Sequence, residues 1–229
     1  MKRRKFFLAI GSVGMVAAAH GKSQAPKTAV SEAQRSFASA MQAIEQRVGG
    51  RLGVAVLDTG SGLSQGWRQD ERFPMCSTFK MLLAGQVLSE VDVRRERLDA
   101  EVRFDRSILV EHSPVTEKHA GISPMTVAQL CDAVVTISDN GAANLLLDRL
   151  GGPAGFTRYM RSLGDTVTRL DRIEPAMSES RPGDVRDTTS PEAMLTSMRA
   201  LTLGRSLSVA GRKQLVDWML ANKTGDNCL

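Results

Sequence analysis

The apolar positions between residues 31 and 48 recur at the spacing of one face of an α-helix. They are Phe37, Met41, Ile44 and Val48. Intervals of three and four residues place side chains on one side of a helix. Ser31 and Gln34 have the spacing of an N-terminal capping box, and two glycines follow Val48. The pattern predicts an amphipathic helix over this stretch.

Residues 52–68 change to the alternation of a β-strand. Leu52, Val54 and Val56 are separated by smaller residues, and the run Asp-Thr-Gly-Ser-Gly follows at 58–62. Such a run between two extended segments is typical of a hairpin. We therefore expect residues 63–68 to return as its second strand.

From Ser77 onward the pattern is almost wholly helical. A second capping box, Thr126 with Gln129, opens a new apolar face. This face contains Leu130, Val134 and Ile137. Two further apolar faces follow, the first with Leu145–Leu147 and Leu150, the second with Phe156, Tyr159, Met160 and Leu163. Residues 169–190 differ, because they are polar and interrupted by two prolines. A long segment of this kind in a compact chain is typically functional or disordered.

Composition places the chain among globular proteins. Its 229 residues are 42% hydrophobic and 24% charged, which allows one large domain or two small ones and excludes a disordered or fibrous chain. The net charge of +5 first suggests an acidic partner. However, four basic residues lie within residues 2–5, and the remainder has 26 basic against 25 acidic residues. Since few aromatic side chains are available for stacking, we exclude nucleic-acid binding.

The first 19 residues have the parts of a secretory signal. The basic residues precede an apolar run, Phe6–Ala19, that ends in three alanines. This run is too short to span a bilayer comfortably, and no later segment is apolar enough to anchor the chain. The stretch Arg3–Leu8 resembles a twin-arginine signal, with an ordinary Sec leader as the alternative. We expect a periplasmic protein with residues 1–19 as the signal and residues 20–30 as a linker.

Cysteine and histidine usage does not indicate a metal centre. The residues concerned are Cys76, Cys131, Cys228, His20, His112 and His119. The odd number of cysteines leaves at least one thiol unpaired within the chain. Neither set has the spacing of a zinc site. We expect no metal and no other cofactor.

Ser77 and Lys80 are the first candidate catalytic pair. They lie three residues apart, directly before the apolar helical run Met81–Ala84. Backbone N–H groups and the helix dipole on a first helical turn suit a developing oxyanion. Lys80 lies on the same face and can accept or hold the hydroxyl proton. The spacing alone is weak evidence, because a helix with an ordinary surface lysine also produces it.

Ser138-Asp139-Asn140 is a rarer combination between two predicted helices. There a second hydroxyl and a carboxamide can face the first serine. Ser and Asp are also good helix N-caps, so a purely structural interpretation stays open.

A third element lies in the polar segment, where Arg169–Pro175 leads to the Arg-Asp-Thr-Thr of residues 186–189. The order and spacing of all three elements resemble the class A serine β-lactamases. The resemblance extends over essentially the whole chain after the leader. It implies an α/β plus all-α fold, in which an antiparallel sheet flanked by helices is joined to a helical domain.

This resemblance also implies a domain organisation. Residues 31–68 are then the first part of the α/β domain, and residues 69–219 are the helical domain with the family's Ω-loop at 169–187. Residues 220–229 begin the return to the α/β domain.

The resemblance implies that the protein hydrolyses the β-lactam ring of penicillins and cephalosporins through an acyl-enzyme, and so confers antibiotic resistance. Ser77 is then the nucleophile, and Lys80 and Glu174 are the alternative bases for its activation. Ser138 relays a proton to the ring nitrogen, and Glu174 activates the deacylating water. Asn140 is expected to bind the side-chain amide of the substrate.

Further roles follow from the same resemblance. The Glu174-Pro175 bond is expected to be cis, and Arg172 and Asp187 are expected to form the ion pair that closes the Ω-loop. Asp139 is assigned a structural role.

Several positions depart from the family pattern. Ser178 stands where the family usually has an Asn that helps to hold the deacylating water, and His112 occupies a place often held by an aromatic residue that gates the pocket. We expect both to contact the substrate region, with an ordinary surface histidine as the alternative for His112. A shorter hydroxyl at 178 puts turnover in doubt but not acylation.

The cysteines also differ from the family pattern. Ala84 occupies the position of a disulfide partner for Cys131, so Cys131 is expected to be a buried free thiol. Cys76 resembles the carbapenem-hydrolysing branch, although a cysteine here also occurs outside it. Cys228 does not match the position of its partner.

Lys223-Thr224-Gly225 spells the third family motif but lies too close behind Glu174. It matches instead the loop before the family's final strands. We therefore expect a C-terminally truncated chain without its last strands and last helix, and inactive as a free polypeptide.

Two rival functions share the Ser/Lys chemistry. A penicillin-binding D-Ala-D-Ala peptidase lacks the Glu174-Pro175 loop, and a non-hydrolysing β-lactam sensor domain stays acylated and is normally tethered to a membrane. The leading hypothesis is a monomer that takes a small-molecule β-lactam and, after signal removal, binds no membrane.

The route of export can be tested in the leader. We expect the double substitution Arg3→Lys/Arg4→Lys to abolish periplasmic delivery, because the twin-arginine route requires the arginine pair. Fractionation of expressing cells measures this. Undiminished delivery of the double variant would assign the chain to the Sec route.

Overall fold

The computed structural model describes residues 32–225. The predicted helix at the start of this range is α1 (Glu32–Val48), while its expected cap Ser31, the signal at 1–19 and Cys228 lie outside the described residues. Phe37, Met41 and Ile44 are half-buried, as their spacing predicts, whereas Val48 is 65% exposed.

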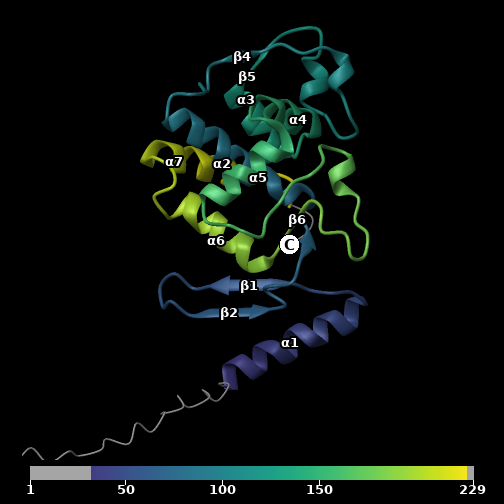
Figure 1. The fold of residues 1–229 in the computed structure, drawn as a ribbon, viewed down its shortest axis with the longest axis vertical. Helices are drawn as coiled ribbons and strands as arrows, with labels where there is room; N and C mark the ends of the chain where they lie inside the picture. Colours follow the sequence, from purple (N-terminus) through teal and green to yellow (C-terminus); the bar gives the residue numbers. More distant parts are fainter. Residues whose placement is uncertain (1–31, 226–229) are drawn as a thin grey trace, which may run out of the picture.

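The predicted hairpin is confirmed. Strand β1 (Val54–Leu57) pairs antiparallel with β2 (Ser64–Trp67), and Val54 lies opposite Trp67. Figure 1 shows the hairpin between α1 and the helices of the rest of the chain. Helix α6 (Pro191–Thr202) lies against β1. A Cβ atom on Gly53, just before β1, would lie 2.4 Å from the Phe73 ring, so this close approach requires glycine.

Helix α2 (Phe79–Asp92) runs through the middle of the helical part. Its residues from Phe79 to Leu88 are buried except for Met81, which is typical of a helix packed on all sides. The helices around it are α4 (Asn140–Arg149), α5 (Gly152–Ser162), α6 and α7 (Val209–Leu220). The rings of Phe79 and Phe156 meet edge to face at 5.9 Å. Because α2 begins at the Ser77 turn, this core fixes the candidate nucleophile.

The capping box of Thr126 and Gln129 is confirmed by both of its hydrogen bonds, at 2.7 and 3.2 Å. The helix that it opens is not continuous, however. Helix α3 (Val127–Asp132) widens into a π-helix (Ala133–Ile137), which ends at Ser138 in the left-handed conformation with φ +64°. The apolar spacing of these residues carries no sign of the wider turn.

The expectation of an almost wholly helical chain after Ser77 is wrong for residues 93–125. These residues contain 3₁₀ turns at Arg106–Ile108 and Thr116–Lys118, and strand β4 (Glu101–Val102) pairs with β5 (Met125–Thr126). Proline at 114 and positive φ angles at Arg94 and His112 prevent a regular helix here.

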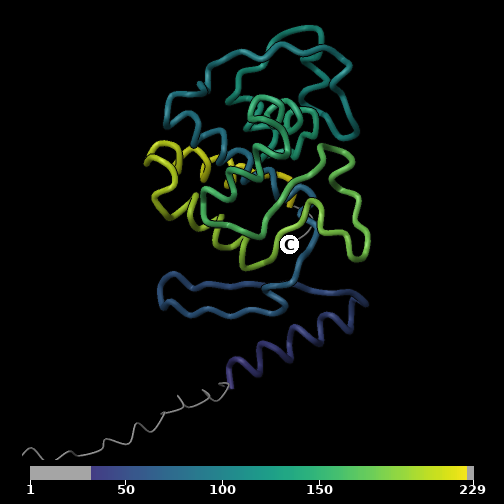
Figure 2. Tube along the Cα trace, in the orientation of Figure 1, coloured from purple at the N-terminus to yellow at the C-terminus, as the bar shows by residue number. Residues whose placement is uncertain are grey.

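A short strand pair joins two distant parts of the chain. Strand β3 (Phe73–Pro74) lies directly before the Ser77 turn and pairs with β6 (Thr188–Thr189). Figure 2 shows the chain of residues 169–187 running out from the helices and returning beside this segment. The polar loop is thereby anchored to the backbone that carries the serine. Within residues 32–225, no helix is long and apolar enough to cross a membrane.

Candidate active site

Ser77 lies in a tight 3₁₀ turn (Cys76–Thr78) that leads directly into α2. The backbone N–H and the hydroxyl of Thr78 both donate to the Met75 carbonyl, at 3.0 and 2.7 Å. Cys76 has φ +44°, an uncommon angle for a residue with a side chain. Ser77 itself is exposed and lines a cavity of about 500 Å³. The turn thus presents the hydroxyl at the mouth of a pocket of small-molecule size.

Lys80 is the centre of the polar contacts around Ser77. Although it is only 2% exposed, its ammonium is surrounded by oxygen atoms. Its Nζ lies 3.3 Å from Ser77 Oγ, 2.8 Å from the Ser138 carbonyl, 3.0 Å from Ser138 Oγ, 2.5 Å from Asn140 Oδ1 and 3.3 Å from Glu174 Oε1. Burial lowers the pKa of Lys80, and the negative charge of Glu174 partly opposes this. A lowered pKa favours the neutral amine, which can act as a base.

Asp139, the middle residue of Ser138-Asp139-Asn140, is a helix cap, which is the structural interpretation left open for this motif. It is fully buried, and its Oδ1 caps α4 by accepting from the Ala142 N–H at 2.8 Å. Its Oδ2 accepts from the N–H groups of Val115 and Thr116, at 2.8 and 3.0 Å. The carboxylate therefore ties the 93–125 segment to the start of α4, while its neighbour Ser138 contacts Lys80.

Asn140 and His112 lie on the outer side of this junction. The Asn140 side chain donates to the Glu111 carbonyl at 2.8 Å and accepts from Lys80, and its N–H donates to the His112 carbonyl. The exposed His112 ring has Nε2 at 3.0 Å from the Ile137 carbonyl. A carbonyl only accepts, so Nε2 carries the proton. Contact of either side chain with substrate stays a prediction.

Glu174 enters the same site from the polar loop. It is 2% exposed, and the bond to Pro175 is cis, as the resemblance implies. Its Oε2 accepts from the Ser178 hydroxyl at 3.2 Å. Its Oε1 lies 3.3 Å from Lys80 Nζ, so the two buried side chains form an ion pair.

Asn144 is a supporting residue that the sequence patterns did not reveal. Its amide donates to the Glu174 carbonyl at 2.9 Å and accepts from the Glu174 N–H at 3.0 Å. Asn is unfavourable inside a helix, and here it interrupts the apolar run of α4. A polar residue inside an apolar helical run was therefore the one sign in the sequence that Asn144 has a special role. These two hydrogen bonds attach the backbone of Glu174 to α4, a helix of the core.

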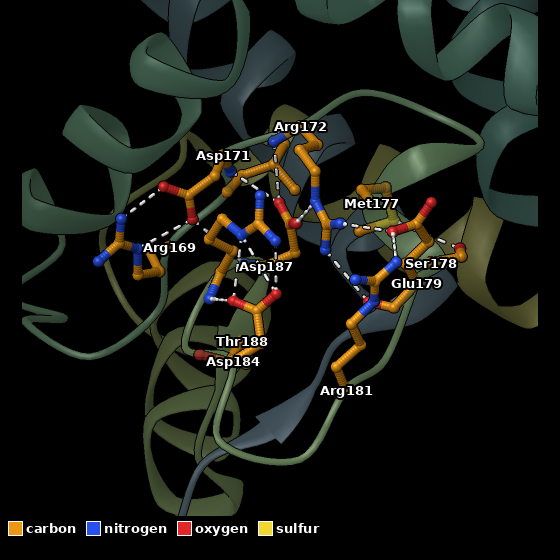
Figure 3. A network of polar contacts seen from close by, with 12 residues as sticks. Arg169, Asp171, Arg172, Met177, Ser178, Glu179, Arg181, Asp184, Asp187 and Thr188 are labelled. Atoms are coloured by element: carbon orange, nitrogen blue, oxygen red, sulfur yellow. Dashed lines mark hydrogen bonds and ion pairs between the residues drawn. The ribbon is translucent and has the colours of Figure 1, made fainter.

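The 169–187 loop closes through Asp187, as Figure 3 shows. Asp187 is 1% exposed and accepts from the N–H groups of Asp171 and Arg172, at 2.7 and 3.0 Å. Its ion pair with Arg172 is present at 2.6 Å. Arg172 also donates to the Glu179 carbonyl, and Arg169 pairs with Asp171. The loop carrying Glu174 is therefore held at its neck by charged hydrogen bonds.

The expectation for Cys131 is confirmed. Cys131 is a free thiol with no exposure, and burial raises its pKa far above the usual range. Cys76 is exposed and free among the described residues. No group of three His, Cys, Asp or Glu residues between 32 and 225 is arranged to hold a metal ion.

Comparison with known proteins agrees with this geometry. The model of the β-lactamase enzyme family matches residues 36–229. β-Lactamase L2 of Stenotrophomonas maltophilia is 47% identical over 215 residues, or 94% of this chain and 70% of that protein. The carbapenem-hydrolyzing β-lactamase KPC of Klebsiella oxytoca is 49% identical over 184 residues, or 80% of this chain and 62% of that protein.

Solved structures give the same result. An ancestral (GNCA) class A β-lactamase is 59% identical, with a TM-score of 0.82 over 83% of this chain and 73% of that chain. The chain therefore belongs to the β-lactamase family, and within it to class A. The fold class expected from the sequence is confirmed. The chain spans 70% of the L2 relative and 62% of the KPC relative.

The neck of the 169–187 loop can be tested by Asp187→Ala. This change removes the acceptor of the Arg172 Nε–H and of two backbone N–H groups, and leaves the half-buried guanidinium with its contacts to Glu179. We expect the free energy of unfolding to fall by about 3 kcal/mol, the usual cost of breaking a buried ion pair, as measured by urea denaturation.

Asp99→Ala is the matched control, because Asp99 pairs with Arg97 at 2.7 Å but both side chains are more than 70% exposed. We expect no measurable change there. Equal effects of the two substitutions would contradict the role given to Asp187.

Proposed function

We propose that this chain carries the groups that hydrolyse β-lactam rings through a serine acyl-enzyme, and that the protein confers resistance to penicillins and cephalosporins. The observation that carries the proposal is the position of Lys80. One buried amine lies within 3.3 Å of Ser77 Oγ, Ser138 Oγ and Glu174 Oε1. These are the groups needed to move a proton from a nucleophile to a leaving group and to activate water.

Acylation begins with attack of Ser77 Oγ on the ring carbonyl. Lys80 takes the serine proton, since it is the only ionisable side chain among residues 32–225 with a hydrogen bond to that hydroxyl. The N–H of Ser77 supplies one oxyanion donor. Ser138 Oγ, at 3.0 Å from Lys80 Nζ, passes a proton to the ring nitrogen as the C–N bond breaks. The lysine thus connects both ends of the proton transfer.

Glu174 acts as the general base for deacylation. Its carboxylate takes a proton from water, which attacks the acyl carbonyl and releases the product from Ser77. Ser178 donates to the other carboxylate oxygen and so orients it. A D-Ala-D-Ala peptidase and a β-lactam sensor share the acylation groups but not this buried carboxylate. Its place beside Lys80 therefore favours hydrolysis over both alternatives.

Export and substrate range are further parts of the proposal. The basic and apolar leader at 1–19 supports export to the periplasm, where β-lactams reach their targets. We propose that the protein acts there as a monomer. Likeness to the carbapenem-hydrolyzing relative and the cysteine before Ser77 support carbapenems as an additional substrate class.

The nucleophile is tested with Ser77→Ala in the full-length protein. We expect the wild-type protein to release many equivalents of hydrolysed nitrocefin, and the variant to lose at least about a thousandfold in rate, because no acyl-enzyme forms. Intact-mass spectrometry follows the adduct.

Ser162→Ala is the control, since the hydroxyl of that exposed serine donates to the Tyr159 carbonyl of its own helix. A stable stoichiometric adduct on wild-type protein would support the sensor or peptidase function instead. Full hydrolysis by Ser77→Ala would refute the mechanism.

The base for acylation is tested by the pH dependence of Glu174→Gln. The carboxylate raises the pKa of Lys80 against the lowering by burial, so its removal lowers that pKa further. If neutral Lys80 is the base, the acylation rate falls when the pH drops below the pKa of Lys80, because the protonated amine cannot accept the serine proton. This acid-side fall of the acylation rate, its acid limb, then moves to lower pH in the variant. Stopped-flow acylation across pH measures this.

Deacylation of the same variant is expected to fall by roughly 10²–10⁴-fold, the usual contribution of a general base. Loss of acylation by a similar factor, without any movement of the limb, would assign the first proton transfer to Glu174.

A further inference from the structure

The end of α7 contacts the turn that carries Ser138. Asn222, just after α7, donates from its side-chain amide to the Val135 carbonyl at 2.6 Å. The next residue, Lys223, donates its backbone N–H to the Thr136 carbonyl at 3.0 Å. Both carbonyls belong to the π-helix that ends at Ser138. These contacts join segments almost ninety residues apart in the sequence.

The last carbonyls of a helix have no partner within it and must be satisfied from outside. In this π-helix three consecutive carbonyls are satisfied in this way. Asn222 binds that of Val135, Lys223 binds that of Thr136, and the His112 ring binds that of Ile137. The wide turn is therefore stabilised from outside just before the catalytic hydroxyl.

The position of Ser138 depends on this turn. Its left-handed φ of +64° is unfavourable for a residue with a side chain and persists only where the surroundings impose it. In this conformation both its carbonyl and its hydroxyl reach Lys80, at 2.8 and 3.0 Å. A small rotation of the turn would lengthen both distances.

We propose that Asn222 is a positioning residue for acylation, which holds the π-turn so that Ser138 Oγ stays within reach of Lys80. The inference rests on the proposed hydrolytic function and adds to it a residue outside the three motifs. Asn222 also lines the cavity beside Ser77. It acts through the Val135 carbonyl, however, and needs no contact with substrate.

The two halves of the Asn222 amide make different contacts. Its nitrogen binds Val135, whereas its Oδ1 accepts from the N–H and hydroxyl of Thr224, both at 2.9 Å. Asn222→Asp keeps the acceptor for Thr224 and replaces the donor to Val135. It also places a carboxylate oxygen against the Val135 carbonyl, which is repulsive. The substitution therefore separates the turn contact from the local structure after α7.

In the full-length protein we expect Asn222→Asp to slow acylation by nitrocefin roughly tenfold, since displacement of a catalytic group by a fraction of an ångström has effects of this order. Deacylation is expected to stay within about twofold, because Asn144 and the 169–187 loop hold Glu174 independently. Stopped-flow measurement of the two steps gives this split. Asp217→Asn is the control, an acid–amide exchange at an exposed position of α7.

Hydrogen exchange supplies a readout that does not depend on activity. The Asp139 N–H donates to the Ala133 carbonyl across the π-turn, so we expect faster exchange in residues 133–140 of Asn222→Asp and unchanged exchange in α5. Unchanged exchange in 133–140, unchanged acylation, or an equal fall in both steps would overturn the inference. Failure of the wild-type protein to acylate at Ser77 would instead overturn the proposed function, and the exchange result would still show whether Asn222 holds the turn.

Discussion

The buried ammonium of Lys80 is the constraint around which the site is organised. A charged amine that is 2% exposed is unfavourable unless oxygen atoms replace its water. Ser138, Asn140 and Glu174 supply them from two segments that are distant in sequence, and Ser77 adds its hydroxyl. Satisfying this one group therefore brings Ser77, Ser138 and Glu174 together. Burial lowers the pKa of the lysine, although the charge of Glu174 partly opposes this, and a lowered pKa favours the neutral amine that can act as a base.

Two other buried carboxylates form the frame of the site without taking part in its chemistry. Asp139 binds the backbone of Val115 and Thr116 and caps α4, and Asp187 binds the backbone of the 169–187 loop. Each accepts several N–H bonds, which satisfies its charge away from water. The two carboxylates thus connect irregular segments of the chain to the helical core. Contacts between near neighbours in the sequence would not fix the position of these segments.

The groups that the proposed mechanism assigns to acylation and to deacylation are held by different elements. Glu174 is fixed by Asn144 of α4 and by the neck of its loop, whereas Ser138 is fixed by the π-turn and the chain after α7. Lys80 is the group common to both. The supports of Ser138 and of Glu174 are therefore separate in the structure.

The sequence by itself determined the regular elements and the reactive residue types. Helical spacing located α1 and α5, the turn run located the hairpin, and the three motifs identified Ser77, Lys80 and Glu174. These depend on neighbours within a few residues, where propensity and capping act. Only the tertiary structure decided the π-turn before Ser138, the irregular 93–125 segment and the supporting roles of Asn144 and Asn222. The partner of Asn144 lies 30 residues away and that of Asn222 lies 87 residues away, so no local pattern records the hydrogen bonds that they make.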